Sequence, residues 1–256
     1  GLLMTINGLA PIISPILGSL LLEYISWKGV FVFLALIGVI VLIFSFRLKE
    51  SLSVENRLQG SIFSTFLTFG VIIKNRLFMS YVGIQSFLLG SMFAYIAASP
   101  FILQSFYGLS AFIFSLCFGA NGAALVIGAN VGGKLPNRKA LAIGVLAFVV
   151  AALYTIAVLI IQPYWLFVEI GFFAMLLLMG ITFPAISSLA MESERQYAGS
   201  ASALLGFAPF FLGGVVSPLV GIGNIFYSTA LVILACNVLA LAIYWMVRHK
   251  IPNSAE

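Results

Sequence analysis

Long runs of apolar residues, separated by short polar segments, dominate the chain. Charge-free stretches of about twenty residues can cross the hydrocarbon core of a bilayer as helices. These stretches lie at residues 1–22, 29–46, 77–133, 140–168, 164–191 (interrupted only by Glu169) and 196–247. The third and the last are long enough for two spans each, with turns expected near residues 106–110 and 221–224. The pattern therefore predicts an all-α membrane protein with eight transmembrane helices.

Residues 58–73 are also free of charge but show a different pattern. Ile62, Phe66 and Phe69 follow one helical stripe, whereas Ser61 and Thr65 share another face. Such a short amphipathic segment is typical of a helix that lies in the membrane interface. We therefore expect residues 58–73 to lie on the membrane and not to cross it.

The basic residues indicate the orientation. With eight spans, eleven Lys and Arg residues fall on one side of the membrane and only Lys28 on the other. The positive-inside rule makes the basic side cytoplasmic, and the C-terminus is then cytoplasmic as well. The domain organisation expected is two helices in 1–48, a cytoplasmic linker in 49–76, a six-helix bundle in 77–248 and a tail in 249–256.

Composition excludes several classes of protein. Of the 256 residues, 62% are hydrophobic and 7% are charged, and the mean hydropathy is +1.20, whereas about a quarter of a soluble domain is charged. The net charge of +5 is spread over several loops, so it predicts no nucleic-acid partner. Because paired carboxylates, metal-ligand spacings and phosphate-binding loops are missing from the sequence, we expect neither an enzyme nor a metal or other cofactor. Cys117 and Cys236 lie in apolar runs and are expected to be small buried residues.

Two segments share an uncommon pattern of proline and small residues. Both have Gly-x-Ala-Pro followed by Ser-Pro-x-x-Gly. The first copy contains Gly8, Pro11, Pro15 and Gly18, and the second contains Pro209, Ser217, Pro218 and Gly221. Proline in a membrane helix removes a backbone hydrogen bond and bends the helix. Bent helices at corresponding places in two halves of a membrane protein indicate a transporter built from repeats.

Polar groups deep in the spans are candidates for a substrate cavity. The residues expected to share one cavity near the middle of the membrane are Gln85, Tyr95, Asn121, Phe173 and Met179. Flexible Met and aromatic side chains suit varied apolar ligands, although they can equally face lipid or the protein core. We expect Asn130 to join helices within Gly128-x-x-x-Gly132, and Glu169 to reach water because it lies only one turn inside its span.

Several motifs together resemble the major facilitator superfamily. The Gly8 to Gly18 segment is similar to its antiporter motif, although Ser14 stands where a glycine usually precedes the proline. Residues 133–139 are similar to its cytoplasmic loop motif without the usual acidic residue. Residues 26–31, 98–102 and 198–204 resemble the Bcr/CflA drug-resistance branch.

The resemblance implies a function and a larger fold. It implies the last two helices of an N-terminal half followed by the six-helix C-terminal half of a twelve-helix transporter, with the first four helices missing. It also implies export of small hydrophobic drugs in exchange for protons, by alternating access across a bacterial inner membrane, with the coupling carboxylates in the missing helices. Two alternatives stay open: an uptake symporter for a sugar or metabolite, and a truncated membrane protein that transports nothing.

Overall fold

The computed structural model describes residues 17–18, 20–47 and 68–251 as helices joined by short turns. Its helices are α2 (Trp27–Ser45), α4 (Arg76–Ser99), the π-helix η2 (Pro100–Phe106), α5 (Ala111–Gly132), α6 (Asn137–Ile161), α7 (Trp165–Ser193), the short 3₁₀-helix η3 (Arg195–Tyr197), α8 (Ala198–Leu219) and α9 (Ile225–Val247). Within these ranges, seven helices are long and apolar enough to cross a membrane. The all-α membrane class is thus confirmed. The first of the eight predicted spans, residues 1–22, lies mostly outside the described residues, although residues 20–24 at its end are helical.

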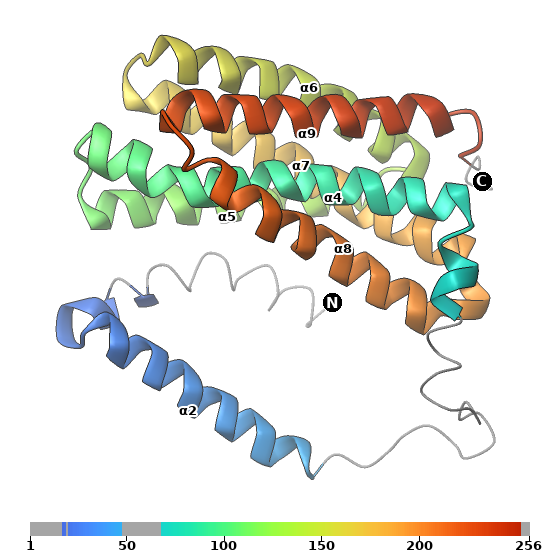
Figure 1. Cartoon of the computed structure of the whole chain (residues 1–256), viewed down its shortest axis with the longest axis horizontal. Helices are drawn as coiled ribbons and strands as arrows, with labels where there is room; N and C mark the ends of the chain where they lie inside the picture. The colour runs from blue at the N-terminus through green and yellow to red at the C-terminus, as the bar shows by residue number, and fades with distance from the viewer. Residues whose placement is uncertain (1–16, 19, 48–67, 252–256) are drawn as a thin grey trace.

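The six helices from α4 to α9 form two layers (Figure 1). Contacts run from α5 to α7, from α7 to α4 and from α4 to α8, so these four helices form one layer. The second layer consists of α6 and α9, which contact each other and pack against α7 and α4 respectively. Exchanging α4 with α7, α5 with α8, and α6 with α9 reproduces the same set of main neighbours. The bundle is therefore built from two three-helix units in equivalent arrangements, as in transporters with internal repeats.

Helix ends follow local capping signals. The Asn75 side chain accepts hydrogen bonds from Leu77 N and Phe78 N at the start of α4, and Asn224 has the same role in α9. Gly108 and Gly223 adopt positive φ angles of 72° and 77° in the turns predicted before α5 and α9. Both are positions where a residue without Cβ avoids backbone strain.

Tyr107 links two of the connections between helices. Its hydroxyl donates a hydrogen bond of 2.7 Å to the carbonyl of Pro163, in the turn between α6 and α7. Burial raises the pKa of Tyr107 above its ordinary value. The turns after η2 and α6 are thereby fixed to each other.

The contact between α5 and α7 depends on three glycines. A Cβ on Gly128 would lie 3.0 Å from Gly180 Cα and would collide with the carbonyl oxygen of Leu177. A Cβ on Gly132 would similarly collide with the Ile181 carbonyl oxygen. The predicted small-residue face of α5 is confirmed, because it lets the two backbones touch.

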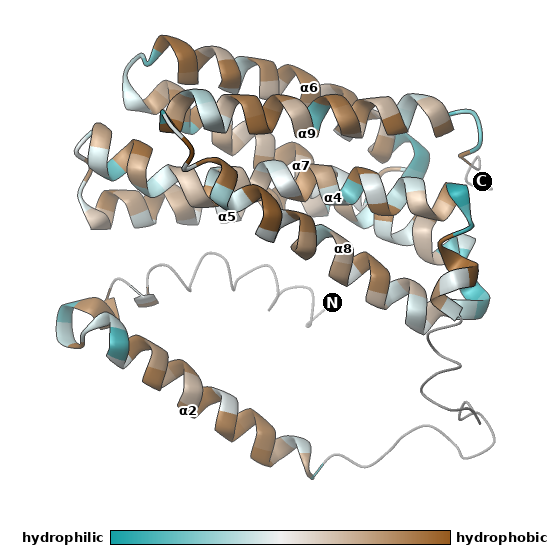
Figure 2. Ribbon diagram, viewed as in Figure 1, coloured by the Kyte–Doolittle hydropathy of each residue, from teal (hydrophilic) through white to brown (hydrophobic). Residues whose placement is uncertain are grey.

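Hydropathy is distributed as a membrane bundle requires (Figure 2). Apolar residues cover most of each helix, and hydrophilic residues gather near the helix ends. No residue of α2 is buried within the described part of the chain, so the apolar surface of this helix is open to lipid or to further helices. Of the predicted interfacial segment, residues 68–72 are helical and Ile72 is fully buried, and residues 58–67 lie outside the described residues.

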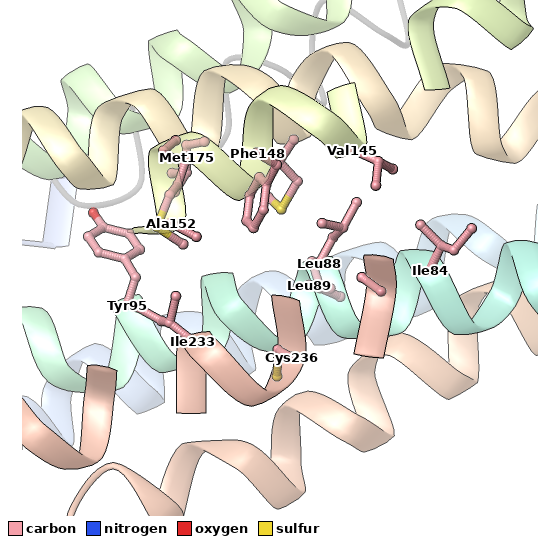
Figure 3. Packing of buried hydrophobic residues seen from close by; sticks show 14 of the residues in the cluster. Ile84, Leu88, Leu89, Tyr95, Val145, Phe148, Ala152, Met175, Ile233 and Cys236 are labelled. Atoms are coloured by element: carbon pink, nitrogen blue, oxygen red, sulfur yellow. The ribbon is translucent and has the colours of Figure 1, made fainter. Parts of the chain in front are cut away.

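The core lies between the two layers. Figure 3 shows Ile84, Leu88 and Tyr95 of α4 facing Val145 and Phe148 of α6 across the bundle interior. All five side chains are at most 2% exposed. Because lipid is as apolar as this core, close packing rather than the hydrophobic effect must supply the stabilisation.

Candidate functional site: a buried carboxylate between α4, α5 and α7

Three polar side chains from three helices meet inside the bundle. The Asn121 side-chain nitrogen Nδ2 donates hydrogen bonds to Glu169 Oε1 at 2.8 Å and to the Tyr95 hydroxyl oxygen at 3.0 Å. Tyr95, Asn121 and Glu169 are 1%, 0% and 8% exposed. One amide on α5 therefore joins α4 to α7 through both of its hydrogens.

Aromatic packing fixes the tyrosine of this network. The Tyr95 ring stacks on Phe118 of α5 with centroids 5.7 Å apart, and its centroid lies 4.8 Å from that of Phe172 on α7. Such ring pairs stabilise by about 1 kcal/mol beyond the area they bury. The hydroxyl is thereby held where the Asn121 amide can reach it.

The prediction that Glu169 reaches water is wrong. Glu169 does lie one turn inside α7, but α5 covers it and the Asn121 amide holds its carboxylate. The signal was present in the sequence, since Glu169, Phe172 and Leu176 follow an i, i+3, i+7 pattern that places them on one stripe. All three are buried, and Glu169 is the only buried acidic residue in the part of the chain described.

An apolar groove between α5 and α7 leads to this carboxylate. It has a volume of about 450 Å³, within the range of small-molecule sites. Its lining residues are Ile113, Leu116, Cys117, Ala120, Trp165, Leu166, Glu169, Ile170 and Phe173. Glu169 is the one charged group among them, and its second oxygen, Oε2, has no hydrogen-bond partner within the described ranges.

A larger hollow lies at the connections between helices. It has a volume of about 670 Å³ and is lined by Phe101, Ser105 and Phe106 of η2, by Gln162, by Gly221 and by residues 223–226. These residues form turns and helix ends, and none of them carries a charge.

The structure separates the predicted cavity residues into two levels. Tyr95 and Asn121 touch each other, and Phe173 lines the groove beside Glu169. Gln85 lies ten residues before Tyr95, and Met179 lies ten residues after Glu169, each a distance of about 15 Å along its helix. Since α4 and α7 run in opposite directions, Gln85 and Met179 lie on the same side of the Tyr95–Glu169 level.

The two residues of the second level differ in exposure. Met179 is buried in the core at 1% exposure. Gln85 is half-buried, and its side-chain oxygen Oε1 has no hydrogen-bond partner among the described residues. A shared cavity that joins both levels stays a prediction.

Much of the repeated proline motif can be placed only in its second copy. Gly8, Pro11 and Pro15 lie outside the described residues, and Gly18 is helical with open space where a Cβ would point. In α8, Pro209 is internal and buried, while Pro218 belongs to the last turn. The Ser217 hydroxyl donates to the Gly213 carbonyl at 2.8 Å, and Gly221 follows the helix end. The Ser217 hydroxyl thus gives a backbone carbonyl next to the proline an additional hydrogen bond, as is common in membrane helices that contain proline.

Two other predictions about polar and sulfur-containing residues have different outcomes. Asn130 does not join helices, because its side chain is exposed and donates to the carbonyl of Val126 in its own helix at 2.9 Å. The contact is made by Gly128 and Gly132 instead. Cys117 and Cys236 are buried free cysteines, as predicted. Across the described ranges, His, Cys, Asp and Glu residues form no group able to hold a metal ion.

Comparison with known proteins decides the family. Residues 1–218 match the Major Facilitator Superfamily. The chain belongs to the major facilitator superfamily. It is accordingly a multi-pass membrane protein, and the two equivalent three-helix units agree with the inverted repeats of the fold.

Individual relatives within the superfamily are similar over most of the chain. The uncharacterized MFS-type transporter YdgK of Bacillus subtilis is 37% identical over 87% of the chain. The bicyclomycin resistance protein homolog of Haemophilus influenzae is 26% identical over 94%, and the multidrug transporter MdfA of Edwardsiella piscicida is 21% identical over 80%. The chain spans 57%, 63% and 51% of the lengths of these three proteins.

Proposed function

We propose that the protein exports small hydrophobic compounds across the inner membrane of a bacterium in exchange for protons. Substrate would reach a cavity that opens alternately to the two sides, with the C-terminus in the cytoplasm. In this proposal the chain supplies the last two helices of one half and all six helices of the other, in a transporter of twelve helices.

The observation that carries the proposal is the character of the groove between α5 and α7. Its walls are apolar and aromatic, and Glu169 is the one charged residue among those that line it. Sites for sugars need several convergent hydrogen-bonding groups to replace water, whereas a greasy compound needs mainly apolar area. The names of the Haemophilus and Edwardsiella relatives, which refer to bicyclomycin resistance and multidrug transport, agree with this substrate class.

The proposed cavity has two parts. The first contains Tyr95, Asn121 and Phe173, at the level of the groove. The second contains Gln85 and Met179, about 15 Å away along the helices. The bends at Pro15 and Pro218, in the two copies of the proline motif, would let the corresponding helices flex as the cavity changes sides.

Drug accumulation tests the direction of transport. The full-length protein is expressed in cells that lack their own drug exporters, and uptake of uncharged hydrophobic drugs is followed with and without a protonophore. Export lowers the steady-state drug content relative to cells with the empty vector, and the protonophore removes the difference. A rise in drug content would establish uptake, and equal contents for every compound tested would contradict the proposal.

A proteoliposome assay tests coupling separately. An imposed pH gradient should drive drug movement in the direction opposite to the proton flow. Each addition of drug should dissipate the pH gradient faster than in protein-free vesicles. Drug movement that is indifferent to the gradient would overturn the antiport mechanism while leaving the substrate class in place.

A further inference from the structure

The adjoining ends of α6 and α9 carry positive charge that no acidic residue balances. α6 begins at the end of the bundle where α9 ends, and the two helices pack against each other (Figure 1). Lys139 lies in the first turn of α6, and Arg248 and Lys250 directly follow α9. Residues 134–168 and 225–251 contain neither Asp nor Glu. These two helix ends therefore present only cations, on the side of the membrane predicted to be cytoplasmic.

The acidic residues at the end of α7 have partners on other elements. Glu192 pairs with Arg195 of η3 at 3.1 Å, the one ion pair within the described part of the chain. Glu194 Oε1 accepts a hydrogen bond of 2.6 Å from the Asn75 side chain, which caps α4. Across the described ranges, the three basic residues named above thus have no carboxylate partner, and their charge is available to a ligand.

The turn that carries two of these cations is anchored to the bundle. The Lys250 backbone nitrogen donates a hydrogen bond of 2.8 Å to the Val247 carbonyl. Val247 and Ile251, on either side of the basic residues, are 7% and 3% exposed, whereas the Lys250 side chain is exposed. The positive charges are therefore fixed at the surface of the bundle, beside the start of α6.

An aromatic ring orients the Arg248 guanidinium. Its central carbon lies 3.7 Å from the centroid of the Trp245 ring, and its Nε donates to His249 Nε2 at 3.2 Å. Its two terminal nitrogens have no acceptor among the described residues. Stacking covers a face of the guanidinium and leaves the terminal N–H groups for a phosphate, which arginine can bind with two parallel hydrogen bonds. Trp245 is 47% exposed, as is usual for tryptophan at the level of the lipid head groups.

Exposed apolar stripes continue from the charged ends along both helices. On α6, Ile143, Leu146 and Val150 follow an i, i+3, i+7 pattern and are all exposed. On α9, Leu239 and Met246 lie seven residues apart and are exposed as well. A ligand with a phosphate at the helix ends could therefore place hydrocarbon chains along these stripes.

We propose that the adjoining ends of α6 and α9 bind an anionic phospholipid, with its phosphate at Lys139, Arg248 and Lys250 and its acyl chains along the exposed stripes. A basic residue at the membrane surface strengthens the binding of an anionic lipid about fivefold. A free phosphate ion would gain the charge contacts but none of the apolar ones. The proposal goes beyond the proposed function and does not depend on what is transported or in which direction.

Fluorescence quenching of Trp245 tests the site. The full-length protein, with its other tryptophans replaced by phenylalanine, is reconstituted in mixtures of phosphatidylcholine and phosphatidylglycerol. One lipid or the other carries brominated acyl chains, which quench tryptophan on contact, so the quenching gives the relative affinity of the two lipids beside Trp245. We expect phosphatidylglycerol to bind at least tenfold more tightly. Equal quenching by the two lipids would overturn the proposal.

Charge variants separate a local site from a general attraction between the protein and anionic lipid. Lys250→Gln should lower the preference for phosphatidylglycerol about fivefold, and Lys139→Gln/Lys250→Gln should lower it further. Arg47→Gln is the matched control, because Arg47 also follows a spanning helix and lies over an aromatic ring, 6.0 Å from the centroid of Phe44. It should leave the preference unchanged. An equal fall in Arg47→Gln and Lys250→Gln would assign the preference to overall charge and contradict the site.

Two further controls concern the occupant and the fold. Inorganic phosphate, added at constant ionic strength, should leave the quenching by brominated phosphatidylglycerol unchanged. Competition by phosphate would identify a free anion as the ligand and overturn the lipid site. Lys139→Arg/Lys250→Arg keeps both charges and should keep the lipid preference. Loss of the preference in this variant as well would show that the two lysines act only through folding, and would contradict the proposal.

Discussion

Gly128 of α5 and Gly180 of α7 are in backbone contact, because a Cβ built on Gly128 would lie 3.0 Å from the Cα of Gly180. The neighbouring Gly132 has the same relationship to Ile181. The two helices that carry Asn121 and Glu169 are therefore held together by a contact that tolerates no side chain.

This contact predicts a strong effect of side-chain volume. Gly128→Val should destabilise the bundle by about 2 kcal/mol, because overpacking forces the two backbones apart. Thermal unfolding of the purified protein in detergent measures the change. Gly214→Val is the matched control, since a Cβ at that position on α8 meets open space within the described structure. Equal losses for the two variants would show that the backbone contact contributes no special stability.

The hydroxyl of Tyr95 provides a second prediction. Tyr95→Phe keeps the ring contacts with Phe118 and Phe172 but removes the acceptor for one amide hydrogen of Asn121. The loss should be about 1 kcal/mol of unfolding free energy. Tyr154→Phe is the control, because the Tyr154 hydroxyl makes a longer bond of 3.2 Å at an exposed position. Retention of full stability by Tyr95→Phe would mean that water replaces the lost hydroxyl.

Pro209 allows the role of the bent helix to be tested. Proline at this internal position of α8 cannot donate to the Leu205 carbonyl, four residues earlier. Pro209→Ala should restore the hydrogen bond, raise the melting temperature by a few degrees and slow export. Pro218→Ala, in the last turn, should change stability less. Faster or unchanged export by a stabilised Pro209→Ala protein would exclude a role for flexibility at this proline.

The orientation predicted from charge can be tested by cysteine labelling. Cys117 and Cys236 are first replaced by alanine, and a single cysteine is then placed at exposed Lys139 or Ile222. A membrane-impermeant maleimide added to intact cells should label Ile222→Cys and should label Lys139→Cys only after permeabilisation. Ile222 is preferable to Gly223, whose φ of 77° does not suit a side chain. The reverse labelling pattern would invert the topology.

Helix positions were largely predictable from the sequence because membrane spans depend on simple rules. Uncharged runs gave the spans of α2 and α4 to α9, and Gly108, Pro163 and Gly223 marked the turns between them. Close packing at Gly128 and Gly132 was also predicted, since small residues four apart form one face of a helix.

Side-chain partners were much less predictable. Glu169 was expected to reach water because the sequence places it only one turn from the helix start. The sequence does not show that α5 packs over this part of α7. Asn130 was expected between helices. The contact with α7 is made instead by Gly128 and Gly132, two residues to either side of Asn130, and the Asn130 amide lies on the outer surface of α5. Which residues of α5 face α7 depends on the rotation of each helix about its axis, and hydropathy carries little of this information when all sides are apolar.

The unequal lengths of the helices have a consequence for how the protein sits in lipid. α4 with η2 has 31 residues and α7 has 29, and these two lie side by side at the middle of their layer, between α5 with 22 residues and α8, which together with η3 has 25. A straight helix of 29 residues is about 44 Å long, against a hydrocarbon thickness of about 30 Å. The middle pair must tilt or protrude where the flanking pair fits upright, so a thicker or thinner bilayer acts on the two pairs unequally. A change in lipid chain length therefore changes the forces on α4 and α7, the two helices that the hydrogen bonds of Tyr95, Asn121 and Glu169 link through α5.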